Sequence, residues 1–222
     1  MSNGTVESRS VNPDDWGEAQ PGPLNGRIGL ELAELLVTLV RQQPDVRSIC
    51  DLGCGNGYLA GRLGALGHRV VGLDASVPYL EAARQYYASD NVTFRRAVFG
   101  ADADLAHEDE AAFDLVISSD VIEHLYRPAD LIETAARLLR PGGRLIVGTP
   151  YHGYWKNLAI SVLGKWDEHH GVHWQGGHIK FFSVETLSQL VGNAGFSDIR
   201  FHFYGRAPWF WKNMICVARK VE

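Results

Sequence analysis

Apolar and polar positions follow two spacings along the chain. Short, largely apolar runs bounded by glycine, proline or polar residues are typical of buried strands, and apolar residues at helical spacing are typical of amphipathic helices. By these criteria, strands are predicted at 46–52, 68–74, 91–96, 113–118, 144–149, 196–204 and 213–218. Helices are predicted at 24–43, 59–66, 76–88, 127–139 and 183–192.

The order of these elements indicates the fold class. Strands and helices alternate through residue 149, and such alternation implies a parallel sheet with right-handed crossovers. The last two strands follow each other and are expected to form an antiparallel pair at the sheet edge. We therefore expect a doubly wound α/β domain over residues 24–222, preceded by a polar, flexible arm over residues 1–23. Within the arm, Trp16 is interpreted as an anchor rather than a lid.

A glycine turn between the first predicted strand and the next helix is the strongest candidate for a ligand site. The stretch Asp51-Leu52-Gly53-Cys54-Gly55-Asn56-Gly57 departs from the dinucleotide pattern G-x-G-x-x-G, because Tyr58 occupies the third glycine position. Asp74 ends the next strand, where a carboxylate can accept hydrogen bonds from both hydroxyls of a ribose. Asp51 could face an amine. These features favour a ligand with a ribose and an amino-acid tail over NAD.

Three stretches resemble one family. The glycine turn resembles motif I of class I S-adenosylmethionine-dependent methyltransferases, with Asp74 in the ribose-binding position. The stretch Ser119-Asp120-Val121-Ile122-Glu123-His124-Leu125 resembles motif IV, including the Glu-His-Leu ending of ubiquinone-biosynthesis O-methyltransferases and related small-molecule enzymes. The turn Leu139-Arg140-Pro141-Gly142-Gly143 before a strand is a further shared feature.

The resemblance implies a Rossmann-like sheet of seven mostly parallel strands with an antiparallel last strand. It also implies S-adenosylmethionine as cofactor and S-adenosylhomocysteine as product. Arg27 is the candidate for the cofactor carboxylate, and Val98, with Ala97 as a second choice, for the adenine. The expected cofactor-binding residues are Arg27, Asp51, Gly53, Gly55, Asp74, Val98 and Ser119.

Residues 151–182 interrupt the strand–helix alternation and are expected to form an inserted cap over the acceptor pocket. The segment holds five of the nine histidines and three of the six tryptophans, and aromatic walls with a few polar groups are typical of small-molecule pockets. His178 is the first candidate for a general base, with a backbone hydrogen bond as the alternative role. His124 is the second candidate, and it could equally cap its helix.

A metal site in the cap is the less favoured interpretation. Glu168, His169, His170 and His173 are competent ligands, but their spacing is not a standard helical pair, so no metal is expected. Methyl transfer to a hydroxyl of a small molecule is the preferred function, with a nitrogen acceptor as the alternative. A nicotinamide-dependent oxidoreductase and a catalytically silent cofactor-binding protein are the alternatives from other classes.

Composition changes this interpretation little. The net charge is −5 with no long basic run, so no nucleic-acid partner is expected. Cys50, Cys54 and Cys216 form no C-x-x-C and predict neither a disulfide framework nor a zinc site. The sequence shows no signal peptide and no apolar run that could span a membrane, so a cytoplasmic location is expected. The oligomeric state is left open.

Overall fold

The seven predicted strands form one sheet in the computed structural model, which describes residues 20–99, 110–170 and 177–221. The strands are β1 (Ser48–Leu52), β2 (Arg69–Asp74), β3 (Val92–Arg96), β4 (Phe113–Ser119), β5 (Leu139–Pro150), β6 (Phe196–Tyr204) and β7 (Asn213–Lys220). Their order is β3-β2-β1-β4-β5-β7-β6. Neighbouring strands from β3 to β5 are parallel, and β7 is antiparallel to both β5 and β6. The predicted fold class is confirmed.

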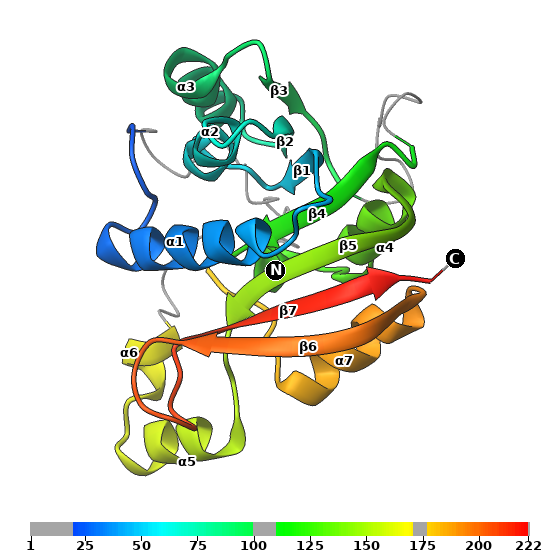
Figure 1. The fold of residues 1–222 in the computed structure, drawn as a ribbon. Helices are drawn as coiled ribbons and strands as arrows, with labels where there is room; N and C mark the ends of the chain where they lie inside the picture. The colour runs from blue at the N-terminus through cyan, green and yellow to red at the C-terminus, as the bar shows by residue number, and fades with distance from the viewer. Residues whose placement is uncertain (1–19, 100–109, 171–176, 222) are drawn as a thin grey trace, which may run out of the picture.

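Helices cover both faces of this sheet (Figure 1). One face carries α1 (Arg27–Arg41), α2 (Tyr58–Gly64) and α3 (Val77–Tyr87), and the other carries α4 (Ala129–Leu138) and α7 (Val184–Asn193). Successive side chains of a strand point to opposite faces, and β5 shows the division. Ile146 packs in the cluster that contains Leu36 of α1, whereas Val147 packs in the cluster that contains Leu187 of α7.

Strand β5 begins earlier than predicted. The expected strand starts at residue 144, but the observed strand starts at Leu139 and its pairing with β4 shifts register between Phe113 and Leu115. Gly142 has a φ of 70° within this stretch. A glycine with positive φ allows an extra residue to bulge out of a strand without ending it. The Pro-Gly-Gly sequence therefore bends the strand instead of preceding it.

The cap begins with two helices, α5 (Tyr154–Val162) and α6 (Trp166–His170), which project from the end of the sheet where β5 ends (Figure 1). Lys156 of α5 is only 3% exposed. Its Nζ donates hydrogen bonds to the carbonyl oxygens of Tyr151, at 2.6 Å, and Lys212, at 3.5 Å. A buried lysine thus fastens the cap to the end of β5 and to the loop before β7.

Some predictions lie outside the described residues, namely those on Trp16, His173 and Trp174. Within the part of the chain that the structure describes, no helix has both the length and the apolar character needed to cross a bilayer.

Candidate cofactor and acceptor site

The glycine turn between β1 and α2 has a backbone that only glycine adopts readily. Gly53 has a φ of 79°, and a Cβ added there would lie 2.3 Å from Cγ2 of Val121. Gly55 has a φ of 52°, and a Cβ there would lie 2.8 Å from Cδ1 of Leu24. The turn therefore combines left-handed backbone with close packing on both sides, which explains the glycines at alternate positions.

The backbone amides of the turn are already used within the protein. The carbonyl oxygen of Leu73 accepts hydrogen bonds from the amides of Gly53, at 2.7 Å, and Cys54, at 3.1 Å. Oδ2 of Asp74 accepts the amide of Gly55 at 2.8 Å. A phosphate-binding loop presents such amides to the ligand. Because these three amides point to a carbonyl and a carboxylate, the turn offers a poor cradle for a pyrophosphate.

Asp74 and Asp51 line the cavity that opens beside the turn. The oxygens of Asp74 accept the amides of Ser76, at 2.9 Å, and Gly55. Burial raises the pKa of Asp74, and the backbone amides oppose that shift. A carboxylate has about four lone-pair sites, so Asp74 retains capacity for ligand hydroxyls.

Asp51 differs from Asp74 because the protein does not satisfy the hydrogen-bonding capacity of its carboxyl group. It is 2% exposed, and its Oδ2 has no hydrogen-bond partner. Burial, followed by the charge of Asp74, raises the pKa of Asp51 to about 7. A buried carboxyl oxygen without a partner is costly. A cationic group of a ligand would remove that cost, so the residue fits the amine that the sequence led us to expect.

Residues 20–25 lie against the glycine turn. The side-chain amide of Asn56 donates to the carbonyl oxygens of Gln20, at 2.6 Å, and Gly22, at 2.8 Å. The amide of Gly22 donates to the hydroxyl of Tyr87 at 2.7 Å. The end of the predicted arm is thus fastened across the turn, and we call residues 20–25 the strap. Asn56 is a residue whose role the sequence did not suggest.

The cavity measures about 1180 Å³ and brings together most of the predicted site residues. Its wall runs from the strap and the glycine turn to the cap. The predicted residues that line it are Asp51, Gly53, Gly55, Asp74, Val98, Ser119, His124 and His178. Sequence motifs thus located residues from β1, β2, β4 and the cap that meet at the carboxyl edge of the sheet, where ligands bind in folds of this type.

Arg27 is not brought to this cavity. Its side chain is 89% exposed and forms an ion pair with Glu31 at 2.9 Å. Ile28 and Leu32 of the same helix line the cavity, and neighbouring residues of a helix point about 100° apart around its axis. The position of Arg27 at the start of α1 therefore turns its guanidinium to solvent. Ala97 is buried beside Val98 and is not part of the wall.

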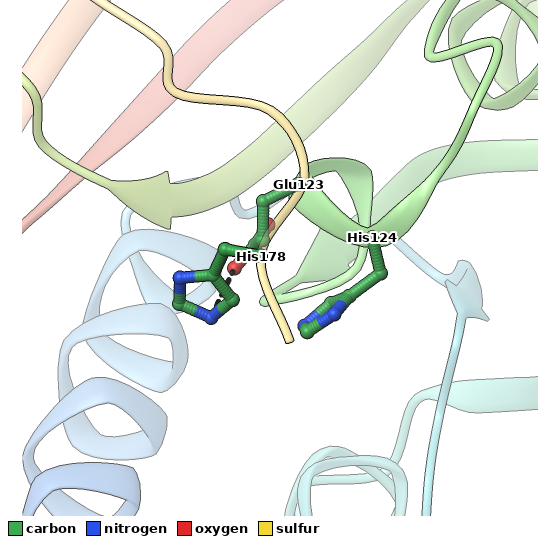
Figure 2. Close-up of side chains that lie close together, drawn as sticks. All are labelled: Glu123, His124 and His178. Carbon is green, nitrogen blue, oxygen red and sulfur yellow. Dashed lines mark ion pairs between the residues drawn. The ribbon is translucent and has the colours of Figure 1, made fainter. Parts of the chain in front are cut away.

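His124 and His178 line the cavity between β4 and the cap, and Glu123 lies close to both without lining the cavity itself (Figure 2). Glu123 is 1% exposed, and its Oε2 accepts the hydroxyl of Thr149 at 3.0 Å. Its Oε1 has no hydrogen-bond partner and lies 3.9 Å from Nε2 of His178. The rings of His124 and His178 are 4.9 Å apart, edge to face. The motif that contains His124 thus also supplies a buried carboxyl group.

Glu123 also holds the turn that carries His178. Its carbonyl oxygen accepts the amides of Ile179, at 2.9 Å, and Lys180, at 3.0 Å. Burial, followed by Asp120, raises the pKa of Glu123 well above its usual range. Burial, followed by His124, lowers the pKa of His178 to about 4. His178 is therefore neutral near pH 7 and able to accept a proton.

The three side chains at this point permit a second use. One ligand atom from each of Glu123, His124 and His178 lies within 4.8 Å of the others, which is close enough for one cation. The ligand set considered from the sequence, Glu168, His169, His170 and His173, is a different one. The contribution of Glu123 was not predicted, although an acidic residue directly before His124 was a visible signal.

The fold and the site define an α/β protein with a cavity at the carboxyl edge of its sheet, where Asp51 and Asp74 form an acidic wall beside a glycine turn whose amides are bonded within the protein. A model of the methyltransferase domain matches residues 25–200, most of the chain. The chain belongs to this family of methyltransferase domains. The prediction of an S-adenosylmethionine-dependent methyltransferase is confirmed at the level of the family.

Relatives with assigned names support this membership. A ubiquinone biosynthesis O-methyltransferase from Roseobacter denitrificans is 31% identical over 170 residues, which cover 74% of this chain and 66% of the relative. The mitochondrial ubiquinone biosynthesis O-methyltransferase from Homo sapiens is 28% identical over 89% of this chain and 57% of its own. The chain thus spans less than two thirds of the length of these relatives.

Solved structures agree on the fold. Magnesium protoporphyrin IX methyltransferase from Synechocystis, determined with bound S-adenosylhomocysteine, aligns with a TM-score of 0.66 and 23% identity. The alignment covers 92% of this chain and 90% of that chain. A putative sarcosine dimethylglycine methyltransferase from Galdieria sulphuraria also aligns with a TM-score of 0.66, at 16% identity.

Proposed function

We propose that the protein transfers a methyl group from S-adenosylmethionine to a hydroxyl of a small molecule and releases S-adenosylhomocysteine. The observation that carries the proposal is a contrast between the hydrogen-bonding groups at the glycine turn. The backbone amides of the turn already donate hydrogen bonds to Leu73 and Asp74. Asp51, by contrast, has a buried carboxyl oxygen without a hydrogen-bond partner and lines the cavity. This wall suits a ribose and an ammonium group and disfavours a pyrophosphate.

Each part of the cofactor has residues that suit it. Asp74 would accept the ribose hydroxyls, and Asp51 would pair with the amino group. Gly53 and Gly55 let the ligand approach the backbone, and Val98, which is 53% exposed at the mouth of the cavity, would lie against the adenine. The bound cofactor supplies an electrophilic methyl group on a sulfonium, and the electrons of the broken carbon–sulfur bond stay on sulfur.

The protein's own part in the reaction is positioning and proton transfer. His178 accepts the proton that the acceptor hydroxyl loses as its oxygen bonds to the methyl carbon. His124 packs edge to face against that imidazole and restricts its orientation. The strap and the cap both line the space between, and we expect them to limit the access of water and to hold the two reactants in line.

An oxygen acceptor is favoured because the named relatives above are O-methyltransferases and because the neutral imidazole of His178, which can accept a proton, lines the cavity. A ring nitrogen or an amine is the second candidate, since such a nucleophile needs less help from a base.

The direct test uses methyl-labelled S-adenosylmethionine with two panels of acceptors, catechols and aromatic amines, and a parallel titration with NADH. We expect labelled product from a catechol and no NADH binding. NADH binding without binding of S-adenosylmethionine would favour an oxidoreductase. Tight binding of S-adenosylhomocysteine without turnover on any acceptor would favour a silent cofactor-binding protein.

The cluster of Glu123, His124 and His178 needs its own test. If His178 acts as a base, dialysis against a chelator leaves turnover unchanged. Loss of activity that a divalent metal restores would instead assign the three side chains to a cation.

A further inference from the structure

The strap, residues 20–25, forms one wall of the cavity at the proposed cofactor end. Pro23, Leu24 and Asn25 line the cavity together with Gly53 and Gly55 of the glycine turn. A ligand in this part of the cavity therefore lies against both the turn and the strap. The way in which the strap is attached decides whether this wall is fixed or movable.

Few contacts hold the strap in place. Asn56 and Tyr87 bind the backbone of Gln20 and Gly22 through three hydrogen bonds of 2.6, 2.8 and 2.7 Å. None of the residues 20–25 is buried. Segments with few buried contacts open locally at a much lower free energy than the core of a protein. The strap is thus attached by side chains at two points and is not packed into the core.

Glycines stand inside the strap at Gly22 and directly after it at Gly26. Their φ angles are 103° and 59°, and a Cβ added at either residue would meet no atom within 4 Å. Packing therefore does not require glycine at these two positions, whereas the backbone does. Pro21 and Pro23 fix their own φ angles, so the freedom of this stretch is concentrated at Gly22. Such positions absorb the dihedral changes of a hinge.

Helix α1 and the glycine turn leave room for the strap. A Cβ added at Gly29, in the first turn of α1, would lie 1.7 Å from the carbonyl oxygen of Leu24. Glycine weakens a helix relative to alanine, and the close approach of the strap explains its presence here. On the other side, a Cβ added at Gly55 would lie 2.8 Å from Cδ1 of Leu24. Two glycines thus provide the space that Leu24 occupies when the strap lies across the turn.

We propose that the strap is a lid over the cofactor site, which opens about Gly22 and Gly26 to admit S-adenosylmethionine and to release S-adenosylhomocysteine. The hydrogen bonds of Asn56 and Tyr87 keep it closed between these events. The identity of the ligand rests on the proposed methyl transfer. A lid must open for entry as well as for exit, so a weaker closed state accelerates both association and dissociation. With a fixed wall, the loss of a wall contact accelerates dissociation alone.

Tyr87→Phe is the principal test, because Tyr87 holds the strap without lining the cavity. The variant keeps the ring and loses the hydroxyl that accepts the amide of Gly22. Loss of one hydrogen bond should raise the association and dissociation rate constants of S-adenosylhomocysteine about fivefold each, and change the dissociation constant by less than about twofold. Surface plasmon resonance on the immobilised protein measures both rate constants. Tyr86→Phe is the matched control, because Tyr86 is the exposed neighbour on α3, and it should keep the wild-type rates.

Gly22→Ala weakens the closed strap by a different route. The added Cβ meets no atom within 4 Å, but alanine is strained at a φ of 103°. Both rate constants should again rise about fivefold. Gly67→Ala is the control for this variant, because Gly67 has a φ of 90°, has the same open space around an added Cβ, and lies in the turn between α2 and β2. It should leave both rate constants unchanged.

Two results would overturn the lid: rate constants in Tyr87→Phe and Gly22→Ala that equal those of their controls, or faster dissociation with unchanged association. Failure of the wild type to bind S-adenosylhomocysteine would instead count against the proposed function. Amide hydrogen exchange of the free protein would then still decide whether the strap opens. The protection factor of the Gly22 amide should be at least about 100-fold smaller than that of Val71, which lies in β2 between two paired strands. Equal protection of the two amides would mean that the strap opens only when the whole protein unfolds, and would also overturn the lid.

Discussion

The proposed cofactor end of the cavity, at Asp51 and Asp74, and the proposed acceptor end, at the cap, are built in different ways. The cofactor end comes from consecutive strands of the sheet and one short turn, and its polar contacts are largely made by backbone amides. The acceptor end comes from segments far apart in the chain, including α6, the turn at His178 and the loop before β7. We infer from this comparison that the sheet provides the part of the site that binds the cofactor, and we expect the inserted parts to determine which acceptor is methylated.

The polar side chains of the site differ in how far the protein satisfies their hydrogen-bonding atoms. Asp74 is satisfied by two backbone amides. Asp51, Glu123 and His170 each keep a buried polar atom without a hydrogen-bond partner. Such atoms cost stability unless a ligand satisfies them. Asp51 and His170 also line the cavity, so their unpartnered atoms are where we expect ligand groups, and the following substitutions test the site at different points.

The largest effect is expected from His178→Ala, which removes the proposed base. Turnover on a hydroxyl acceptor should fall by about 100-fold or more, the usual contribution of a positioned general base. Cofactor affinity, measured by calorimetry, should change by less than about twofold because His178 lies toward the cap. In the wild type, kcat/KM should fall on the acid side near the His178 pKa of about 4, since a protonated imidazole cannot accept a proton. An unchanged rate in His178→Ala would exclude the residue as the base.

Asp74→Ala should have the next largest effect, and at the other end of the cavity. The variant loses the ribose contacts and releases the amide of Gly55. We expect S-adenosylmethionine affinity to drop by about 100-fold, in line with two hydrogen bonds to a charged group. Asp74→Asn is the matched control: it keeps one acceptor oxygen and should lose less. Calorimetry that shows equal affinity for wild type and Asp74→Ala would contradict the assignment.

Asp51 should make cofactor binding depend on pH. Its pKa of about 7 in the free protein means that the carboxyl group is neutral below that pH and cannot attract the amine. Affinity should therefore fall by roughly tenfold per pH unit as the pH drops below 7, and level off above it. Asp51→Asn should bind weakly and with a flat pH profile over the same range. A wild-type profile without this slope would show that Asp51 does not pair with the amine.

Asn56→Ala should have the smallest effect, because it acts through the strap. Loss of two hydrogen bonds to backbone carbonyls, each contributing about 1 kcal/mol, should weaken cofactor binding by about 30-fold at most. Cleavage near residues 20–22 in limited proteolysis should become faster. Asn193→Ala, an exposed change at the end of α7, is the control for both measurements. If binding and cleavage were the same in both variants, the strap would have no role in holding the cofactor.

The sequence by itself determined the parts of this protein that depend on local pattern. Alternating apolar runs predicted the sheet and its helices, because burial of one face or of both leaves a periodic signal. Glycines at alternate positions and a carboxylate at the end of the next strand located the cofactor end, because a left-handed turn and a ribose contact each demand particular residue types at short range. Asp74 and Gly53 were therefore predictable from a few neighbouring residues.

Only the tertiary structure decided the rest. Arg27 looked suitable by position, but the rotation of α1 about its axis turns the side chain to solvent. The packing of α1 on the sheet sets that rotation and therefore decides which of two neighbouring residues faces the cavity. His124 and His178 are separated by 54 positions in sequence, and their rings meet at 4.9 Å through the docking of the cap, which no local pattern encodes. Glu123 stood in a predicted motif, yet its role depends on Thr149 and His178. Contacts between distant segments arise from the packing of whole elements, so they become visible only once the chain is folded.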